Sequence, residues 1–367
     1  MLKGLADQMA KAVRVGIVGS GMMGCEHIRN LLLFPGVQIT ALADPTPSSL
    51  DAAAREAKAD VARFETSGAL AASGLVDAVI VASPNFTHRA ALGPLFETGL
   101  HILCEKPLCT TLEDARWAVA QAAAHPAVFW TGMEYRFMPP VARFVAQVHA
   151  GRVGRLVQLS IREHRFPFLT KVGDWNRFSR NTGGTMVEKC CHFFDLMRLI
   201  VQSEPVRVFC SGAMDVNHLD ERYGGETPDI LDNSYTVVDF AGGQRAMLDL
   251  NMFADGARNQ EELAAVGDAA RLEAFIPDGD LVFSPRVGFN RPKQVEVEHV
   301  AVDPAALAAG SHHGATYYQL QAFLKAVRGD GPVGITAEDG LKAVAMGAAA
   351  EISAREKRVV EMAEVDF

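Results

Sequence analysis

The sequence predicts an α/β protein of two domains: an N-terminal doubly wound parallel sheet, then a C-terminal α+β domain with a large, mostly antiparallel open sheet. Three observations predict it. The first third alternates strand-like with helical runs, the later part is rich in strand-like runs, and 367 residues are too many for one ordinary core. We place residues 1–135 in the first domain and 136–367 in the second, with the last helix able to pack back on the first.

Each element of the first domain is predicted from hydrophobic pattern. A strand buried on both faces of a parallel sheet is a continuous apolar run. Such runs lie at 13–18, 37–43, 76–82, 100–104 and 127–131. Helical patterns separate them at 22–33, 48–58, 87–98 and 111–124. This alternation is typical of a parallel doubly wound sheet.

The pattern changes after Pro139-Pro140, where a helix over 141–150 leads into the second domain. Gly242-Gly243 separates two strand-like runs as a hairpin turn would, which favours antiparallel pairing. The strand-like runs are 155–164, 206–213, 233–241, 244–252, 261–266, 271–276 and 295–302. Helical patterns over 313–328 and 337–356 follow.

Composition excludes several classes of protein. The net charge of −9 argues against a nucleic-acid surface, because phosphate binding depends on Lys and Arg. No run approaches a membrane span, and Met1 to Ala12 lacks the apolar core of a signal peptide. The six cysteines show no disulfide framework, so we expect reduced thiols and a cytoplasmic protein. Cys190-Cys191-His192 are adjacent and cannot readily close a tetrahedral site, so no metal is expected.

The most informative motif is a glycine-rich turn directly after the first strand. Gly19 allows the tight turn, Gly21 lets a pyrophosphate approach the backbone, and Gly24 lets the next helix pack closely. The helix N-terminus then directs free N–H groups at the phosphates. The pattern predicts a Rossmann dinucleotide site whose turn residues are Gly19, Ser20, Gly21, Met22, Met23 and Gly24.

An acidic residue follows the second strand at the spacing this site requires. Asp44 stands twenty residues after Gly24 and should accept hydrogen bonds from the ribose hydroxyls while repelling a 2′-phosphate. Pro45-Thr46-Pro47 supplies no arginine for that phosphate. The sequence therefore favours NAD over NADP, although use of both cofactors stays open.

A third motif, Glu105-Lys106-Pro107, ends the strand at 100–104. Ligands of open α/β sheets bind at the carboxyl ends of the strands, so a lysine there can lie near a substrate hydroxyl. The alternative is a surface lysine that merely precedes a loop.

Taken together, these motifs, with Ser83-Pro84-Asn85 and His88, resemble the glucose–fructose oxidoreductase, inositol dehydrogenase and rhizopine catabolism protein family over nearly the whole chain. The second half matches the family's glycine turn and following helix at Gly183 to Asp195. The resemblance implies that Ser83, Pro84, Asn85, His88, Glu105 and Lys106 also contribute to the cofactor site. It further implies a homodimer or homotetramer built on the open sheet face.

The resemblance assigns catalysis to Lys106, Glu188 and His192. A spacing of four puts Glu188 and His192 on one helical face, and histidine titrates near working pH. Oxidation of a secondary alcohol needs a base for the hydroxyl proton while hydride moves to the nicotinamide. Lys106 would polarise the reacting oxygen, His192 would act as acid and base, and Glu188 would support it or contact substrate. Lys106 and His192 could exchange roles.

Two departures from the family leave the substrate open. Inositol dehydrogenases of the family usually carry aspartate at the position of Glu188 and tend to have glycine near Cys190. Glu188 is one methylene longer than aspartate, which moves its carboxylate, and Cys190 is bulkier than glycine, which narrows the substrate pocket that the resemblance implies.

Other residues resemble positions that line the sugar pocket of this family, although each has a purely structural alternative. Asn176 and Arg177 could help to cover the pocket, and Tyr318 and Asn259 are weaker candidates. His312-His313 resembles a metal pair only superficially, and we expect these to be exposed histidines at the start of a helix. The predicted substrate-binding residues are Arg136, His164, Arg165 and Trp175, besides Lys106, Glu188 and His192.

The resulting hypothesis is an NAD-dependent dehydrogenase that acts on a ring secondary alcohol of a sugar, cyclitol or sugar derivative. One alternative within the same fold class is a redox-neutral glycosidase or lyase that retains NAD. Another is a non-catalytic regulator that binds a dinucleotide and a partner protein.

Overall fold

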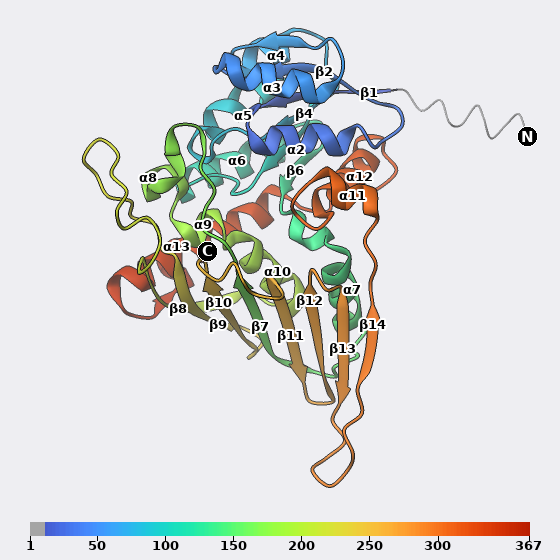
Figure 1. The fold of residues 1–367 in the computed structure, drawn as a ribbon, viewed down its shortest axis with the longest axis vertical. Helices are drawn as coiled ribbons and strands as arrows, with labels where there is room; N and C mark the ends of the chain where they lie inside the picture. Colours follow the sequence, from blue (N-terminus) through green and yellow to red (C-terminus); the bar gives the residue numbers. More distant parts are fainter. Residues whose placement is uncertain (1–11) are drawn as a thin grey trace, which may run out of the picture. The chain divides into compact units, whose positions relative to one another are not determined.

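The computed structural model describes residues 12–367, which form two compact units (Figure 1). The first unit contains residues 12–109, then Glu113–Glu134 and Asp303–Leu341. The second contains Thr110–Leu112, Tyr135–Val302 and Lys342–Phe367. No helix in residues 12–367 is both long and apolar enough to cross a membrane.

The first unit is built on a six-stranded sheet in the order β3-β2-β1-β4-β5-β6, and every pairing in it is parallel. The apolar runs in the sequence became its central strands, whose residues are almost all buried. The strands are β1 Val13–Val18, β2 Val37–Ala43, β3 Ala62–Phe64, β4 Ala78–Val81, β5 His101–Glu105 and β6 Phe129–Gly132. This confirms the predicted doubly wound parallel sheet.

Helices connect these strands, and two further helices of this unit, α11 and α12, come from residues 303–341. The prediction missed β3 and α4, because three and six residues are too few to show a period. It also missed α11, a short helix that Asp303 caps through the N–H of Ala305. The helices are α2 Met22–Leu31, α3 Pro47–Ala57, α4 Ser67–Ala72, α5 His88–Phe96, α6 Leu112–Ala124, α11 Pro304–Ala309 and α12 Ala315–Val327, with a 3₁₀ turn η1 Asn85–Thr87.

The second unit contains a nine-stranded sheet in the order β14-β13-β12-β11-β7-β10-β9-β8-β15. Among the described residues its pairings are antiparallel except for β10 with β7. The strands are β7 Leu156–His164, β8 Pro205–Ala213, β9 Asn233–Phe240, β10 Arg245–Asn251, β11 Glu261–Gly267, β12 Ala270–Ile276, β13 Asp280–Pro285, β14 Glu296–His299 and β15 Val360–Glu361. The mostly antiparallel open sheet is confirmed, although β13 and β15 were not predicted.

Helices cover one face of this sheet. Helix α7 packs on β12 and β13, and α10 packs on β7. The helical elements are η2 Glu134–Phe137, α7 Pro139–His149, η3 Val172–Arg177, α8 Ser179–Thr182, α9 Thr185–Glu188, α10 Cys191–Val201, α13 Ala337–Glu356 and η4 Met362–Val365. Pro139 stands at the first position of α7, where a missing N–H costs nothing.

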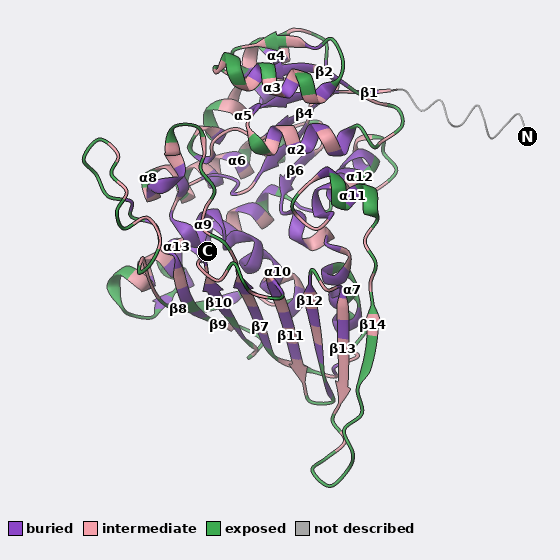
Figure 2. Cartoon of the chain, viewed as in Figure 1, coloured by how far each residue is buried: buried purple, intermediate pink, exposed green. Residues whose placement is uncertain are grey.

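Buried residues alternate with less buried ones along strands of this sheet, as strand geometry requires; Figure 2 colours the strands by burial. In β7, Leu159 and Ile161 are buried on the helix-covered face, whereas Ser160 and Arg162 point outward. The pairing register joins outward residues of neighbouring strands into one row: Phe209, Val237, Met247, Ser160 and Ala264.

A glycine pair before α9 is fixed by a carboxylate from α13. Gly184 has a φ of +91° and no room for a Cβ, which would lie 2.2 Å from Oε1 of Glu351. The same oxygen accepts a hydrogen bond of 2.9 Å from the N–H of Met186. Burial raises the pKa of Glu351 to about 7, more than the Met186 hydrogen bond lowers it.

This raised pKa predicts a pH-dependent stability. The folded protein binds the Glu351 proton more tightly than the unfolded chain, so the stability contributed here falls as pH rises from about 4.5 to 7. Glu351→Gln removes this loss while an amide oxygen can still accept from Met186. The free energy of unfolding of the variant, minus that of the unmodified protein, should therefore increase by up to ~3 kcal/mol from pH 5 to pH 8. Thermal unfolding of both proteins at the two pH values measures this. For the control Glu97→Gln, at an exposed residue, the difference in unfolding temperature from the unmodified protein should be the same at both pH values.

Candidate functional site

The glycine turn after β1 is closed by backbone contacts that leave no room for a larger residue. Gly19 has a φ of +88°, and a Cβ there would lie 2.4 Å from the backbone nitrogen of Ser83. Its N–H donates to the carbonyl of Ala43 at 2.8 Å. The turn is therefore held between the carboxyl ends of β2 and β4.

Helix α2 begins directly on this turn. A Cβ on Gly24 would lie 2.2 Å from the carbonyl oxygen of Gly19, so only glycine lets the helix pack so closely. A Cβ on Gly21, in contrast, would meet no atom within 4 Å, and no side chain caps the helix there. The crowded glycines and the open one occupy the positions that a dinucleotide site requires, so the turn fits a pyrophosphate at the helix N-terminus.

Asp44 is held in place at the end of β2. One carboxylate oxygen accepts from the N–H of Ser20 and the other from the N–H of Thr46, each at 2.8 Å. Each oxygen keeps a further lone pair, which is what a ribose hydroxyl needs. The structure thus joins Asp44 to the glycine turn.

The segment after β4 contains the other predicted cofactor residues, Ser83 to Asn85 and His88. The Thr87 hydroxyl donates to the Ser83 hydroxyl at 2.8 Å, and Asn85 is buried at the start of η1. His88 is fully buried: Nδ1 lies 2.9 Å from the Pro107 carbonyl and Nε2 lies 3.1 Å from that of Ser83. Here the imidazole joins the ends of β4 and β5, a positioning role that spacing alone did not indicate.

A buried ion pair supports Lys106. Oε1 of Glu105 lies 2.7 Å from Nε2 of His27, and Oε2 accepts from the backbone N–H of Lys106 at 3.2 Å. Burial opposes ionisation of Glu105, but the His27 hydrogen bond and the charges of His27 and Lys106 hold its pKa below the ordinary value. His27, which follows the glycine turn on α2, was missed because its partner lies 78 residues away.

Glu134 follows β6 and is a second buried acid at the carboxyl ends of the parallel strands, besides Glu105. It was not identified from the sequence. It is buried, and burial together with the charge of Glu105 raises its pKa to about 7, whereas His312 and Lys106 act in the opposite direction. The carboxyl ends of β5 and β6 thus carry one ionised acid and one that titrates near neutrality.

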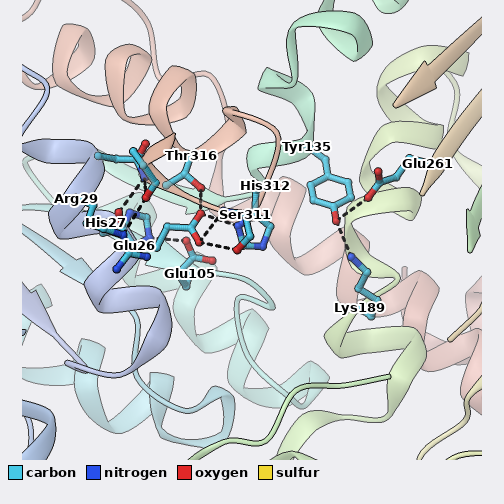
Figure 3. Close-up of polar contacts among 12 residues, drawn as sticks. Glu26, His27, Arg29, Glu105, Tyr135, Lys189, Glu261, Ser311, His312 and Thr316 are labelled. Atoms are coloured by element: carbon cyan, nitrogen blue, oxygen red, sulfur yellow. Dashed lines mark hydrogen bonds and ion pairs between the residues drawn. The ribbon is translucent and has the colours of Figure 1, made fainter. Parts of the chain in front are cut away.

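The Glu26 cluster joins α2 to the chain before α12 (Figure 3). Its carboxylate accepts from the Thr316 hydroxyl at 2.9 Å and lies 2.7 Å from Nδ1 of His312. Burial opposes ionisation, yet these hydrogen bonds and the His312 charge lower the pKa of Glu26 to about 2. A Cβ on Gly310 would lie 2.4 Å from the carboxylate. His312 therefore anchors the start of α12 to α2. The expectation of an exposed histidine at this helix start was wrong for His312, because its ring is bound to the buried carboxylate of Glu26.

In the second unit, the predicted helix with Glu188 and His192 is interrupted. Glu188 ends α9, and His192 is the second residue of α10, with Lys189 and Cys190 between the helices. The N–H groups of Lys189 and Cys190 both bond to the Thr185 carbonyl, and the second of these spans five residues, as in a wider π-type turn. Both predicted residues are buried.

His192 packs flat against an aromatic ring. The rings of Tyr135 and His192 stack with centroids 4.1 Å apart and planes within 7°. Arg136, the next residue, pairs with Asp195 on α10, with Nε 2.6 Å from Oδ2. The structure therefore brings Arg136 to the helix of His192, although the guanidinium is already bound by a carboxylate.

The other predicted substrate residues are spread around this unit. His164 points to the outward face, 3.2 Å from Asp249, so the structure does not bring it together with His192. Arg165 lies 3.6 Å from buried Glu163 and over the ring of Phe166. Trp175 is half-buried in η3.

The weaker candidates have structural partners. Arg177 is buried against Glu221, and Asn176 donates to the Leu169 carbonyl at 3.1 Å. Asn259 pairs with Asp278, and the Tyr318 hydroxyl accepts from the N–H of Asp303. Across residues 12–367, no group of three or more His, Cys, Asp or Glu side chains could hold a metal ion.

Two family models match the two parts of the chain and show the family to which it belongs. Residues 13–133 match the NAD-binding Rossmann-fold model of the Gfo/Idh/MocA oxidoreductase family, and residues 145–362 match its C-terminal alpha/beta domain. The chain belongs to this family. The matched NAD-binding domain of this oxidoreductase lies in the first unit, and most of the matched C-terminal domain lies in the second, with Asp303–Leu341 in the first.

Relatives match over nearly their whole lengths. The rhizopine catabolism protein MocA of Rhizobium meliloti is 27% identical over 95% of this chain and 97% of its own. A myo-inositol 2-dehydrogenase of Thermotoga maritima is 26% identical, covering 96% and 99%. The scyllo-inositol dehydrogenase of Lactobacillus casei, solved with NAD(H) and scyllo-inositol, shares the fold with a TM-score of 0.78 at 23% identity, covering 96% and 100%.

The close approach at Gly24 predicts a large effect of one methyl group. Gly24→Ala would force α2 away from the Gly19 carbonyl, so it should weaken NAD binding at least tenfold and lower the unfolding temperature. Gly99→Ala is the matched control, because a Cβ there meets nothing within 4 Å and its φ is not positive. Calorimetric titration with NAD that gave equal affinities for both variants would contradict the assigned packing role.

Proposed function

We propose that this oxidoreductase transfers hydride between NAD and a ring secondary alcohol of a sugar, cyclitol or sugar derivative. The observation that carries the proposal is the cofactor turn with a fixed Asp44 in a chain whose family resemblance also assigns Lys106 and His192. Relatives named as inositol 2-dehydrogenases over nearly full length support this substrate class.

The cofactor assignment rests on residues of the first unit. Gly19, Gly21 and Gly24 would hold the pyrophosphate, and Asp44 would bind the adenosine ribose. Its carboxylate disfavours a 2′-phosphate, and Pro45-Thr46-Pro47 offers no cation to offset this. When bound, NAD supplies the hydride acceptor for the alcohol carbon.

The family resemblance assigns the proton chemistry to Lys106, His192 and Glu188. Lys106 would donate a hydrogen bond to the reacting oxygen, and His192 would take the hydroxyl proton. In the reverse direction, His192 would return it. Glu188 would stabilise the imidazolium or bind a neighbouring hydroxyl. Arg136, Arg165 and Trp175 are proposed to bind substrate.

The first test measures NADH formation at 340 nm across inositols, aldoses, sugar acids and glycosides, with NAD and with NADP. We expect turnover of one polyol class with NAD. Lys106→Ala and His192→Ala should each lower kcat by at least ~100-fold, since proton transfer by a positioned side chain contributes that much. Both variants should still bind NAD.

Full turnover by either variant would overturn the role of that residue. Release of product from a glycoside without NADH formation would favour the redox-neutral alternative. NAD binding without turnover of any compound would favour a regulator.

We further propose that the protein is a homo-oligomer, a homodimer or a dimer of such dimers, formed through the outward sheet face. Val237 and Phe209, at one end of the outward row, are each about 40% exposed, and neighbouring Tyr235 is 63% exposed. Beside this row, Arg162 pairs with Glu262, and Arg207 with Asp239. An apolar strip bordered by both charges suits a self-complementary two-fold interface.

Val237→Glu tests this interface. A carboxylate in this row would be buried in the proposed interface without a cation to pair with it, so the variant should become monomeric in light scattering after size exclusion. The control Val172→Glu lies in η3, at a residue 67% exposed, and should keep the oligomeric state of the unmodified protein. A monomeric unmodified protein would refute the proposal.

The six cysteines, none of which forms a disulfide within residues 12–367, support a reducing compartment. We accordingly propose a cytoplasmic location.

A further inference from the structure

A buried polar chain begins at the ring on which His192 stacks (Figure 3). The Tyr135 hydroxyl accepts a hydrogen bond of 2.6 Å from Nζ of Lys189 and donates one of 3.3 Å to Oε1 of Glu261. The ammonium also lies 2.8 Å from Oε1 of Glu163. All four residues belong to the second unit, and each is buried.

The chain joins three separate elements to one aromatic ring. Lys189 lies between α9 and α10, whereas Glu163 and Glu261 face each other across β7 and β11. The ammonium is also 4.7 Å from the centre of the Tyr135 ring, a distance that permits a cation–π contact. The phenol is thus held at its hydroxyl and at its face, so its ring plane has little freedom.

Packing alone does not account for this arrangement. Two carboxylates share one lysine, and burial together with the charge of Glu163 raises the pKa of Glu261 to about 7. Buried ion pairs are often no more stabilising than apolar residues of similar volume. Apolar residues could therefore fill this space as well, but they could not fix the phenol through hydrogen bonds.

We propose that Tyr135 and Lys189 are positioning residues for His192: the stacked phenol sets the plane of the imidazole, and the buried ammonium, held by Glu163, fixes the phenol. This inference rests on the proposed role of His192 as acid and base. Orientation matters because a general base works only when its nitrogen is aligned with the proton that it takes.

Three variants of the full-length enzyme test the proposal. Tyr135→Leu removes the stacked ring, and Tyr135→Phe keeps the ring but removes the hydroxyl. The double variant Lys189→Met with Glu163→Gln removes both charges of this ion pair together, so neither Lys189 nor Glu163 is left as a buried charge without the other. Tyr317→Leu is the matched control, because that tyrosine also stacks, with centroids 4.6 Å apart, but on Phe34.

We expect kcat per NAD-binding site to fall at least tenfold for Tyr135→Leu and for the double variant, with KM for NAD changed less than twofold. Tyr135→Phe should retain an intermediate kcat. The solvent deuterium isotope effect on kcat should increase, since misalignment makes proton transfer more rate-limiting. Loss of folded protein alone would change neither kcat per site nor the isotope effect.

His192→Ala separates the two proposals. If this variant keeps full turnover, the proposed role of His192 is wrong. If it is inactive while Tyr135→Phe, Tyr135→Leu and the double variant match the unmodified enzyme in kcat and isotope effect, only the positioning inference is overturned. Should Tyr135→Leu fail to fold, Tyr135→Phe and the double variant decide in the same way.

Discussion

Charge that is removed from water must be compensated at short range, and this constraint shapes both units. In the first unit, Glu105 is buried with His27, and Glu26 with His312. In the second, Lys189 is buried with Glu163. Unpaired, each group would cost several kcal/mol or lose its charge. The pairs therefore fix which segments meet, in a way that interchangeable apolar contacts do not.

The proposed cofactor site and the proposed acid and base His192 differ in what fixes their geometry. The cofactor turn depends on backbone: Gly19 and Gly24 permit approaches that any side chain would prevent. Asp44 is fixed by two N–H groups. His192, in contrast, is placed by a side chain that is itself held by other side chains. Substitution can alter such a side-chain network gradually, whereas the backbone turn accepts few changes.

The strands of the parallel sheet and the glycine turn were predictable because each has a local signature, a continuous apolar run or a fixed spacing of glycines. The break between α9 and α10 was not, since the residues around Lys189 remain compatible with one continuous helix. Neither were the buried acids. Glu163 and Glu261 occupy inward positions of strands that were predicted correctly, but alternation reveals a face and never the partner that will neutralise it.

The first unit is assembled from separated stretches of chain, since Asp303–Leu341 belongs to it. Glu26 on α2 is satisfied by Ser311, His312 and Thr316, which are synthesised some 285 residues later. During translation, the cofactor domain therefore emerges without the partners of one of its buried carboxylates. Exchange of this domain between relatives by recombination would have to transfer two distant gene segments at once, which favours inheritance of both domains together.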